Sequence, residues 1–144
     1  MKASKNPVIR EVKLFTDGGS RGNPGPGAIA FLIVDMENRE LENGAETIGF
    51  CTNNQAEYRA LIKGLDRCAA HTRGRVHCFL DSELVFRQVV GAYRLRNEVL
   101  RSLFQELKAK EAMFVEVRYT HVRRENPYMK KVDRMLNEAL EGRA

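Results

Sequence analysis

The sequence predicts an α/β domain built around a mixed β-sheet. Three short strand-like segments between residues 11 and 50 have tight connections, which favours an antiparallel meander. From residue 52 onward the apolar residues recur at helical spacing, and helices then alternate with strands. With 144 residues, of which 43% are hydrophobic and 30% charged, the chain has room for one core and the composition of a globular protein.

The first third of the chain contains the three strands of the expected meander. Residues 11–17 (EVKLFTD) alternate between two faces with a period of two, as a strand does. Residues 18–27 (GGSRGNPGPG) follow, and their glycines and prolines predict a loop without regular structure. The β-rich apolar run at residues 28–34 predicts the second strand. A third strand is expected near residues 46–50, after a turn-forming segment at 35–40.

A capping box marks the start of the first helix. Thr52 and Gln55 form the S/T-x-x-E/Q pattern, so the helix is expected to begin near Asn53 and to end by Gly74. Residues 75–81 then carry apolar side chains on both faces, which is typical of a central strand.

Two further helices, a strand and a last helix are expected to complete the chain. Ser82 can cap the second helix, which Gly91 interrupts. Apolar spacing predicts a third helix around residues 99–107, a fifth strand over residues 114–120, and a last helix that starts at Pro127.

Acidic residues lie where this order brings distant segments together. In a meander the third strand runs parallel to the first, and a right-handed helical crossover then returns the fourth strand parallel to the first. Asp17 and Asp81 are the last residues of the first and fourth expected strands, and Glu57 lies in the first turn of the first helix. Asp133 borders the apolar stripe of the last helix. We therefore expect these carboxylates to converge at the sheet edge where α/β proteins bind ligands.

Each carboxylate alone has an ordinary explanation, such as compensation of a helix dipole or formation of a turn. Four that converge would repel one another unless they were protonated or neutralised by a bound cation. Carboxylate oxygens suit Mg²⁺ or Mn²⁺, and a pair of such ions about 3.5 to 4 Å apart is the usual device for cleaving a phosphodiester. The cluster therefore predicts a metal-dependent enzyme that acts on phosphodiesters.

Other motifs in the sequence carry less weight. Gly25 opens a G-x-G-x-x-A pattern, but the nearby prolines and the β-rich residues that follow do not fit a dinucleotide site. The three histidines have no metal-ligand spacing, and His77 is expected to be a hydrogen-bonded histidine of the core. Cys51, Cys68 and Cys78 form no C-x-x-C pair and are expected to be buried thiols in a reducing compartment.

Net charge does not identify a binding partner, whereas the absence of long apolar segments bears on where the protein is located. The excess of 24 basic over 19 acidic residues gives a net charge of +5, which suits a polyanionic partner but is also ordinary for a small basic protein. No apolar stretch is long enough to span a membrane, and the N-terminus lacks the apolar core of a signal peptide. We therefore expect a cytoplasmic protein that does not bind membranes.

Four motifs span nearly the whole chain in a fixed order. They are TDGGSRGNPGPGA at 16–28, TNNQAEYRALIKGL at 52–65, LDSELVFRQVVG at 80–91, and THVRREN at 120–126 with VDRMLN at 132–137. Together they resemble type 1 ribonuclease H. The resemblance implies a ribonuclease H-like fold with a five-stranded mixed sheet flanked by helices, in a single domain over residues 11–144 after a short tail of residues 1–10. It also implies that two Mg²⁺ ions hydrolyse the RNA strand of RNA/DNA hybrids, which leaves 5′-phosphate and 3′-hydroxyl ends.

The resemblance assigns catalytic roles to particular residues. Asp17, Glu57, Asp81 and Asp133 match the metal-binding carboxylates of the family, and Asp17 would bridge both ions. His121 matches a loop histidine that is thought to assist water handling or product release.

It assigns substrate contacts as well. Asn23, Asn53 and Asn54 match residues that contact the hybrid in its minor groove and along the backbone. Thr52 matches a residue of the pocket that grips a DNA phosphate. Thr52 is also explained by helix capping and Asn23 by turn formation, and the two kinds of role can coexist.

Departures from the family pattern affect the acidic set and the grip on substrate. Asp133 lies further beyond Asn126 than in better-known members, so an insertion is expected before the final helix, and Glu125 is an alternative ligand. The chain contains no tryptophan and no basic protrusion. Arginines such as Arg94 and Arg96 would then hold the hybrid, although they could equally form a solvated helix face.

A further departure lies beside the expected phosphate pocket, where Phe50 stands at a position that some relatives fill with arginine.

These features predict a monomeric, metal-dependent endoribonuclease that cleaves the RNA strand of RNA/DNA hybrids, with Mn²⁺ as a substitute for Mg²⁺. Double-stranded RNA is a second candidate substrate. The alternative is a non-catalytic nucleic-acid-binding module on the same fold, which the loss of a carboxylate would favour, but all four are present. A related 3′ exonuclease would have Asp-x-Glu on its first strand, and here two glycines follow Asp17.

Overall fold

Five strands form one mixed sheet at the centre of the molecule. The computed structural model describes residues 9–91 and 95–142. The strands are β1 (Glu11–Ser20), β2 (Gly25–Val34), β3 (Glu40–Cys51), β4 (Arg75–Leu80) and β5 (Glu116–His121). Their order across the sheet is β3-β2-β1-β4-β5. The first three pair antiparallel, and β4 pairs parallel with β1 and with β5, so the predicted meander and crossover are confirmed.

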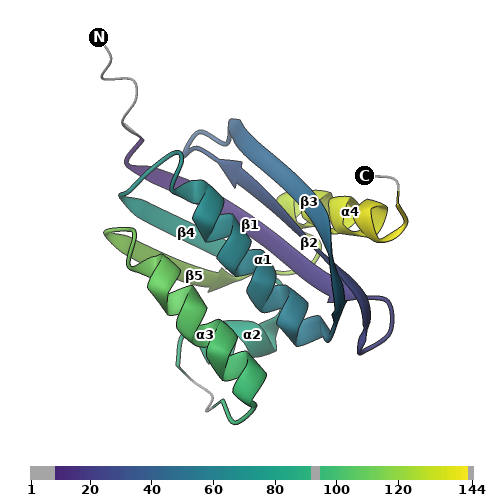
Figure 1. Cartoon of the computed structure of the whole chain (residues 1–144). Coiled ribbons are helices and arrows are strands. Elements are labelled where there is room, and N and C mark those ends of the chain that lie inside the picture. The colour runs from purple at the N-terminus through teal and green to yellow at the C-terminus, as the bar shows by residue number, and fades with distance from the viewer. Residues whose placement is uncertain (1–8, 92–94, 143–144) are drawn as a thin grey trace.

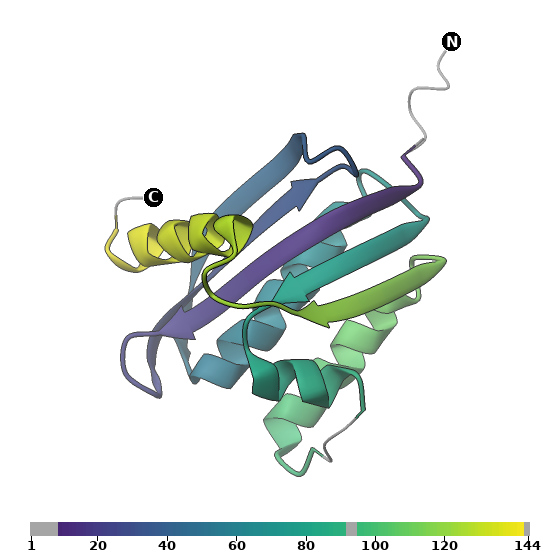
Figure 2. The same ribbon diagram turned by 180° about the vertical axis from the view of Figure 1, so that it is seen from behind.

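Helices cover both faces of this sheet. They are α1 (Asn53–Cys68), α2 (Glu83–Val89), α3 (Glu98–Glu111) and α4 (Pro127–Leu140). Helix α1 crosses one face with α3 beside it, and α4 lies on the opposite face (Figures 1 and 2). The described helices therefore leave the sheet as the middle layer. No helix in the described ranges is long and apolar enough to cross a membrane.

The two faces of the sheet enclose two hydrophobic clusters. Leu14 of β1 packs toward α1, where Tyr58 and Leu61 are fully buried. Phe15, the next residue of β1, belongs to the cluster under α4, together with Val132. This alternation follows from the period of two along a strand, which sends neighbouring side chains to opposite faces.

The glycine- and proline-rich segment forms far more regular structure than its composition predicts. Strand β1 continues through Gly18 and Gly19, and Ser20 pairs with Gly27 of β2. The expected loop over residues 18–27 is therefore wrong, because only residues 21–24 lie between the two strands. Glycine is required here because β1 passes close to other backbone: a Cβ atom on Gly18 would lie 2.3 Å from the Ala56 carbonyl oxygen.

The predicted helix starts are confirmed by their caps. Thr52 Oγ1 accepts a hydrogen bond from Gln55 N at 3.1 Å, and Thr52 N donates to Gln55 Oε1 at 3.0 Å, which completes the capping box of α1. Ser82 caps α2 through Val85 N. The N-terminus of α4 follows Asn126 directly, with Pro127 in the first turn.

Two single-residue expectations have different outcomes. The three cysteines are free and buried, as predicted. His77 is hydrogen-bonded, as predicted, because its Nε2 atom lies 2.7 Å from Glu11 Oε1, but it is only partly buried and so is not a core residue. Its position in an apolar strand concealed this pairing, which depends on the neighbouring parallel strand β1.

Candidate metal-binding active site

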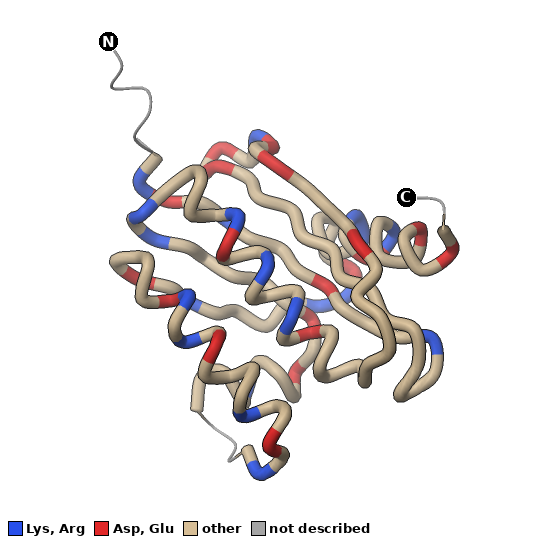
Figure 3. Tube along the Cα trace, viewed as in Figure 1, with Lys and Arg blue, Asp and Glu red and all other residues tan. Residues whose placement is uncertain are grey.

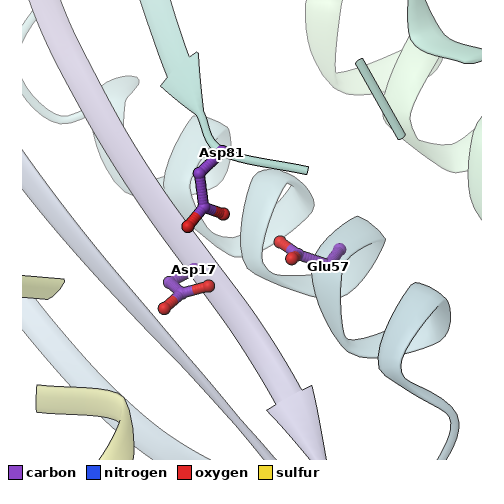
Figure 4. Close-up of side chains that lie close together, drawn as sticks. All are labelled: Asp17, Glu57 and Asp81. Atoms are coloured by element: carbon purple, nitrogen blue, oxygen red, sulfur yellow. The ribbon is translucent and has the colours of Figure 1, made fainter. Parts of the chain in front are cut away.

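Three carboxylates from separate elements meet at one point. Asp17 lies within β1, Glu57 in the first half of α1, and Asp81 immediately after β4. One oxygen of each lies within 4.8 Å of the others. Figure 4 shows the three side chains turned toward one another. The expected convergence is found, although Asp17 stands inside its strand rather than at its end.

The sheet register and one close approach explain why these residues meet. Phe15 of β1 pairs with Phe79 of β4 in parallel, so Asp17 and Asp81, two residues further along each chain, lie level with each other. The absence of a side chain on Gly18 lets β1 pass against the Ala56 carbonyl at the start of α1. Glu57, the next residue of the helix, is thereby held beside Asp17.

A cavity of about 360 Å³ opens over this cluster. Its wall contains all three carboxylates and Asp133, which reaches it from α4. Asn137 Nδ2 lies 3.4 Å from Asp133 Oδ2, one turn further along the helix. Glu125, the alternative to Asp133, is exposed and is not among the described residues that line the cavity.

Burial and mutual repulsion make this cluster hard to ionise. Burial raises the pKa of Asp17 to about 8, with further contributions from the charges of Asp81 and Asp133. The pKa of Glu57 is raised well above its usual value, first by burial and then by Asp17 and Asp81. Burial also raises the pKa of Asp81, against the opposing effect of Arg124. Such a site is electrostatically unfavourable when fully ionised, unless positive charge enters it.

A divalent cation fits these residues. Glu57 Oε1 is buried and has no hydrogen-bond partner among the described residues. A buried oxygen of this kind is costly unless a ligand or ion completes its coordination. The converging donors are carboxylate oxygens, which hard cations such as Mg²⁺ and Mn²⁺ prefer.

Polar residues at the start of α1 connect it with the β1–β2 turn. Asn53 Oδ1 accepts hydrogen bonds from Ser20 N at 2.9 Å and from Ser20 Oγ at 3.0 Å. Asn53 N donates to Asn23 Oδ1 at 3.0 Å. Asn53 and Asn54 line the carboxylate cavity, whereas Thr52 and Asn23 are not among the described residues that line it. Thr52 is the N-cap of α1, and Asn23 lies in the β1–β2 turn.

The other residues singled out from the sequence lie away from the cavity or outside the described chain. His121 Nε2 lies 3.2 Å from the backbone oxygen of Asp81, and its ring centroid is 5.9 Å from that of Phe86. Arg96 is exposed just before α3, and Arg94 falls outside the described residues. The structure therefore brings neither His121 nor Arg96 into the wall of the cavity.

Sequence reasoning missed one charged residue of this site. Arg124 lines the cavity, and its Nε atom lies 3.7 Å from Asp81 Oδ2. Arg124 belongs to the THVRREN motif, in which the resemblance assigns a role only to the histidine. The sequence around an arginine in an exposed loop does not show whether the arginine lines a site or is a solvated surface residue.

A second cavity of about 500 Å³ is lined mainly by residues of β3, α1 and α3. Phe50 stands at its edge with 76% of its surface exposed, close to Thr52 in the chain. Basic and acidic residues are interspersed along α1 and α3 (Figure 3). Lys63 of α1 lies 3.6 Å from Glu46 of β3, and Lys110 of α3 lies 2.9 Å from Asp66 of α1.

Known proteins share this sequence pattern. A sequence model of the reverse transcriptase-like family matches residues 15–129. Ribonuclease HI of Halobacterium salinarum is 37% identical over 132 residues, which are 90% of this chain and 64% of that protein. The bifunctional protein Rv2228c of Mycobacterium tuberculosis is 34% identical over 136 residues, 93% of this chain and 36% of that protein. The chain thus spans less than two thirds of the length of these curated relatives.

Solved structures share the fold. The RNase H1 of Halobacterium salinarum superposes with a TM-score of 0.86 at 35% identity, covering 92% of this chain and 98% of that one. The N-terminal RNase H domain of Rv2228c gives 0.87 at 32% identity, with 92% and 95% covered. LC11-RNase H1, solved in complex with an RNA/DNA hybrid, gives 0.84 at 32% identity, with 91% and 97% covered. With its five-stranded sheet and its converging carboxylates, the chain belongs to the reverse transcriptase-like family and has the fold of type 1 ribonuclease H.

Proposed function

We propose that this protein is a ribonuclease H that hydrolyses the RNA strand of RNA/DNA hybrids. The observation that carries the proposal is the cluster of Asp17, Glu57 and Asp81, in which a buried Glu57 oxygen lacks a partner among the described residues. A similarity of 37% identity to a ribonuclease HI supports it, and so does the fold shared with an RNase H1 solved on a hybrid.

In this proposal the metal ions would be held by Asp17, Glu57, Asp81 and Asp133. Mg²⁺ is the proposed cofactor and Mn²⁺ a substitute, because both prefer oxygen ligands. When bound, two such ions supply an activated water and charge stabilisation at the leaving oxygen. The carboxylates' own task is to stay ionised and fixed in the orientation that holds the ions.

Substrate binding is proposed for the residues around the start of α1. Asn53 and Asn54 line the carboxylate cavity, and Asn23 is hydrogen-bonded to the Asn53 backbone. They are suited to contact the minor groove and the 2′-hydroxyl groups that distinguish RNA from DNA. Thr52 would grip a phosphate of the DNA strand, since its oxygen accepts the capping bond while its hydroxyl proton can still be donated.

Arg94 and Arg96 are proposed as further phosphate contacts. His121 is proposed to assist water handling or product release next to Asp81, whose backbone oxygen it faces. We also propose that the protein acts as a monomer in the cytoplasm, where its three buried thiols would remain reduced.

The test is cleavage of an end-labelled RNA/DNA hybrid beside matched single-stranded RNA and double-stranded RNA. Each substrate is incubated with Mg²⁺, with Mn²⁺ and with a chelator. We expect cleavage of the RNA in the hybrid, dependence on the metal, and products with 5′-phosphate and 3′-hydroxyl ends. The double-stranded RNA arm shows whether the specificity extends to that substrate.

Asp17→Asn serves as the negative control, because it removes a ligand charge without changing side-chain size. Hybrid binding without cleavage by the wild-type protein, under either metal, would support the non-catalytic binding module instead. Metal-independent cleavage, or cleavage that Asp17→Asn leaves unchanged, would contradict the assignment of the site.

A further inference from the structure

Two exposed cations stand on the flank of α4 that adjoins the carboxylate cavity. Lys130 precedes Asp133 by three residues, and Arg134 follows Lys130 by four. Residues three or four apart are neighbours on a helix surface, so Asp133, Lys130 and Arg134 form one continuous band. Asp133 and Leu136 line the cavity from α4. The band therefore leads from the wall of the cavity to the exposed surface on which both cations lie.

The protein itself does not engage these two cations. Among the residues that the structure describes, the side chains of Lys130 and Arg134 have no partner in an ion pair or hydrogen bond. Lys131 points to the other flank of the helix, where its Nζ atom lies 2.6 Å from Glu40 Oε1 of β3. The described residues thus neutralise the β3 flank of α4 and leave two positive charges on the cavity flank.

The fold does not require these two charges. The inward face of α4 is apolar, and Met129, Val132 and Leu136 are buried beneath it. Neither Lys130 nor Arg134 lies in the last turn of the helix, where the helix dipole would favour a cation. A negatively charged partner explains their position better than the stability of the helix does.

A nucleic-acid strand that enters the carboxylate cavity would meet this flank next. Under the proposed function, the scissile phosphate of the RNA strand lies at the carboxylates, which include Asp133. Lys130 and Arg134 stand about 6 Å apart along the helix axis, at about 1.5 Å per residue, so both can lie against the same strand. Asn53 and Asn54 line the cavity from α1 instead, and are placed for another part of the hybrid.

We propose that Lys130 and Arg134 form a phosphate-binding strip that holds the RNA strand of the hybrid beyond the scissile phosphate. The proposal rests on the proposed function. The strip supplies electrostatic binding in a chain that has no tryptophan. It takes no part in the chemical step, because neither residue is among the described residues that line the cavity. Contacts of this kind are independent of base sequence and weaken as salt rises.

The experiment measures hybrid binding separately from cleavage. The strip variant carries Lys130→Gln and Arg134→Gln together, because glutamine removes the charge and remains a good helix former. A control protein carries Arg10→Gln and Arg73→Gln, which remove two exposed charges just before β1 and β4, at the end of these parallel strands away from the carboxylates. A second control is Lys131→Gln, on the other flank of α4.

For the binding measurements every protein also carries Asp17→Asn, so that the hybrid stays intact. Fluorescence anisotropy of a labelled hybrid in Mg²⁺, over a series of salt concentrations, gives the dissociation constant. In the strip variant Kd should rise about three- to tenfold, and the slope of log Kd against log salt should flatten by about one to two units. Both controls should match Asp17→Asn alone. Without the Asp17 substitution, kcat of the strip variant should stay within about twofold of the wild type.

Hybrids with neutralised phosphates assign the strand. Uncharged methylphosphonate linkages replace phosphates on each side of the RNA cleavage position in turn, or the same number of phosphates in the DNA strand. Neutralising the RNA strand on the side that faces the strip should weaken binding without strip substitutions but add little to the loss in the strip variant, because both changes remove one contact. Neutralising the DNA strand should weaken both proteins by the same factor.

Several outcomes would overturn the proposal. Equal losses in the strip variant and in the Arg10/Arg73 control would mean that only overall charge matters. Fully additive effects of the strip substitutions and of RNA neutralisation on both sides would exclude the RNA-strand contact. Lower kcat at unchanged Kd would place the two residues in the chemical step instead. Melting temperatures confirm that each variant is folded, as the exposure of the substituted side chains leads us to expect.

The binding arm also separates this proposal from the proposed function. If the wild-type protein binds the hybrid but does not cleave it, the assignment as a ribonuclease H fails, and the comparison of Kd values still decides whether the strip holds nucleic acid. If cleavage occurs and the strip variant binds the hybrid as tightly as Asp17→Asn alone, the strip is wrong and the proposed function stands.

Discussion

Gly18 lies so close to Ala56 that a Cβ atom at position 18 would stand 2.3 Å from the Ala56 carbonyl oxygen. The contact fixes β1 against the first turn of α1, and so fixes Asp17 relative to Glu57. Gly18→Ala should therefore displace the helix from the strand and move one metal ligand away from the other.

We expect Gly18→Ala to lower the free energy of unfolding by about 1 to 3 kcal/mol, as overpacking does, and to lower hybrid cleavage by a larger factor than this loss explains. Gly19→Ala is the matched control, because the nearest atom to a Cβ there lies at 3.6 Å. Denaturant unfolding and steady-state kinetics on both variants make the comparison. Equal behaviour of the two variants would show that the close approach does not set the site geometry.

Asp17→Asn tests the charge of the cluster itself. The substitution should abolish hybrid cleavage, because it removes a carboxylate from the shared metal site while keeping the size of the side chain. In metal-free buffer its melting temperature should equal or exceed that of the wild type, since repulsion with Asp81 and Asp133 is relieved. Activity and differential scanning fluorimetry with a chelator are the two measurements. A clear drop in melting temperature would mean that the carboxylate stabilises the empty site.

The raised pKa of Asp17 gives the metal-free protein a characteristic pH dependence. Burial, with Asp81 and Asp133, raises this pKa from 3.8 to about 8. Over the interval between these values the folded protein holds a proton that the unfolded chain has released, so the free energy of unfolding falls as pH rises. Melting temperatures in chelator at several pH values should show this decline. Asp17→Asn should make it shallower, and an unchanged slope in that variant would contradict the assignment.

The sequence predicted the order of elements and the meeting of the carboxylates because both depend on local signals and on general rules of chain topology. The capping pair Thr52 and Gln55 marks the start of α1 within a few residues. The right-handed crossover then leaves one arrangement of β1, α1 and β4, which brings Asp17, Glu57 and Asp81 to one edge.

The errors fall where tertiary contacts override local composition. Glycines 18 and 19 predict a loop, yet they lie in β1 because the strand pairs with β2 and packs against α1. Arg124 lies 3.7 Å from Asp81, and no spacing in the chain reveals this approach. His77 has an apolar setting in its own strand, and its partner Glu11 lies on a neighbouring one.

Substitution of Asp133 tests whether the lengthened segment between Asn126 and Asp133 still places a carboxylate at the metal site. The structure has α4 starting at Pro127, so the added residues are helical rather than a loop. Seven residues from Asn126 to Asp133 make almost two turns at about 3.6 residues each, which returns Asp133 to the face of its cap. Asp133→Ala should cut activity strongly, with partial rescue by Mn²⁺.

Glu125→Ala is the matched control for that variant, because Glu125 is exposed and outside the lining of the cavity. It should retain activity near that of the wild type in both metals. Loss of activity in Glu125→Ala with a neutral Asp133→Ala would reverse the assignment of the fourth carboxylate.

Hybrid binding should depend strongly on salt, because the chain has no tryptophan with which to build an aromatic channel for the DNA strand. Phosphate contacts by arginines would then supply most of the affinity, so KM should be high and rise with ionic strength. Counterion release makes the logarithm of the binding constant fall with the logarithm of the salt concentration, with a slope of roughly −0.9 per neutralised phosphate on B-form DNA, which serves as a guide for a hybrid.

Replacing Arg94 and Arg96 together by Ala should flatten this slope by about one to two units and raise KM. Its kcat should stay near wild type, because the carboxylates are untouched. The test is KM measured over a series of salt concentrations. A wild-type slope in the double variant would mean that these two arginines belong to a solvated surface. Substrate binding would then have to depend on the asparagines and Thr52 at the start of α1.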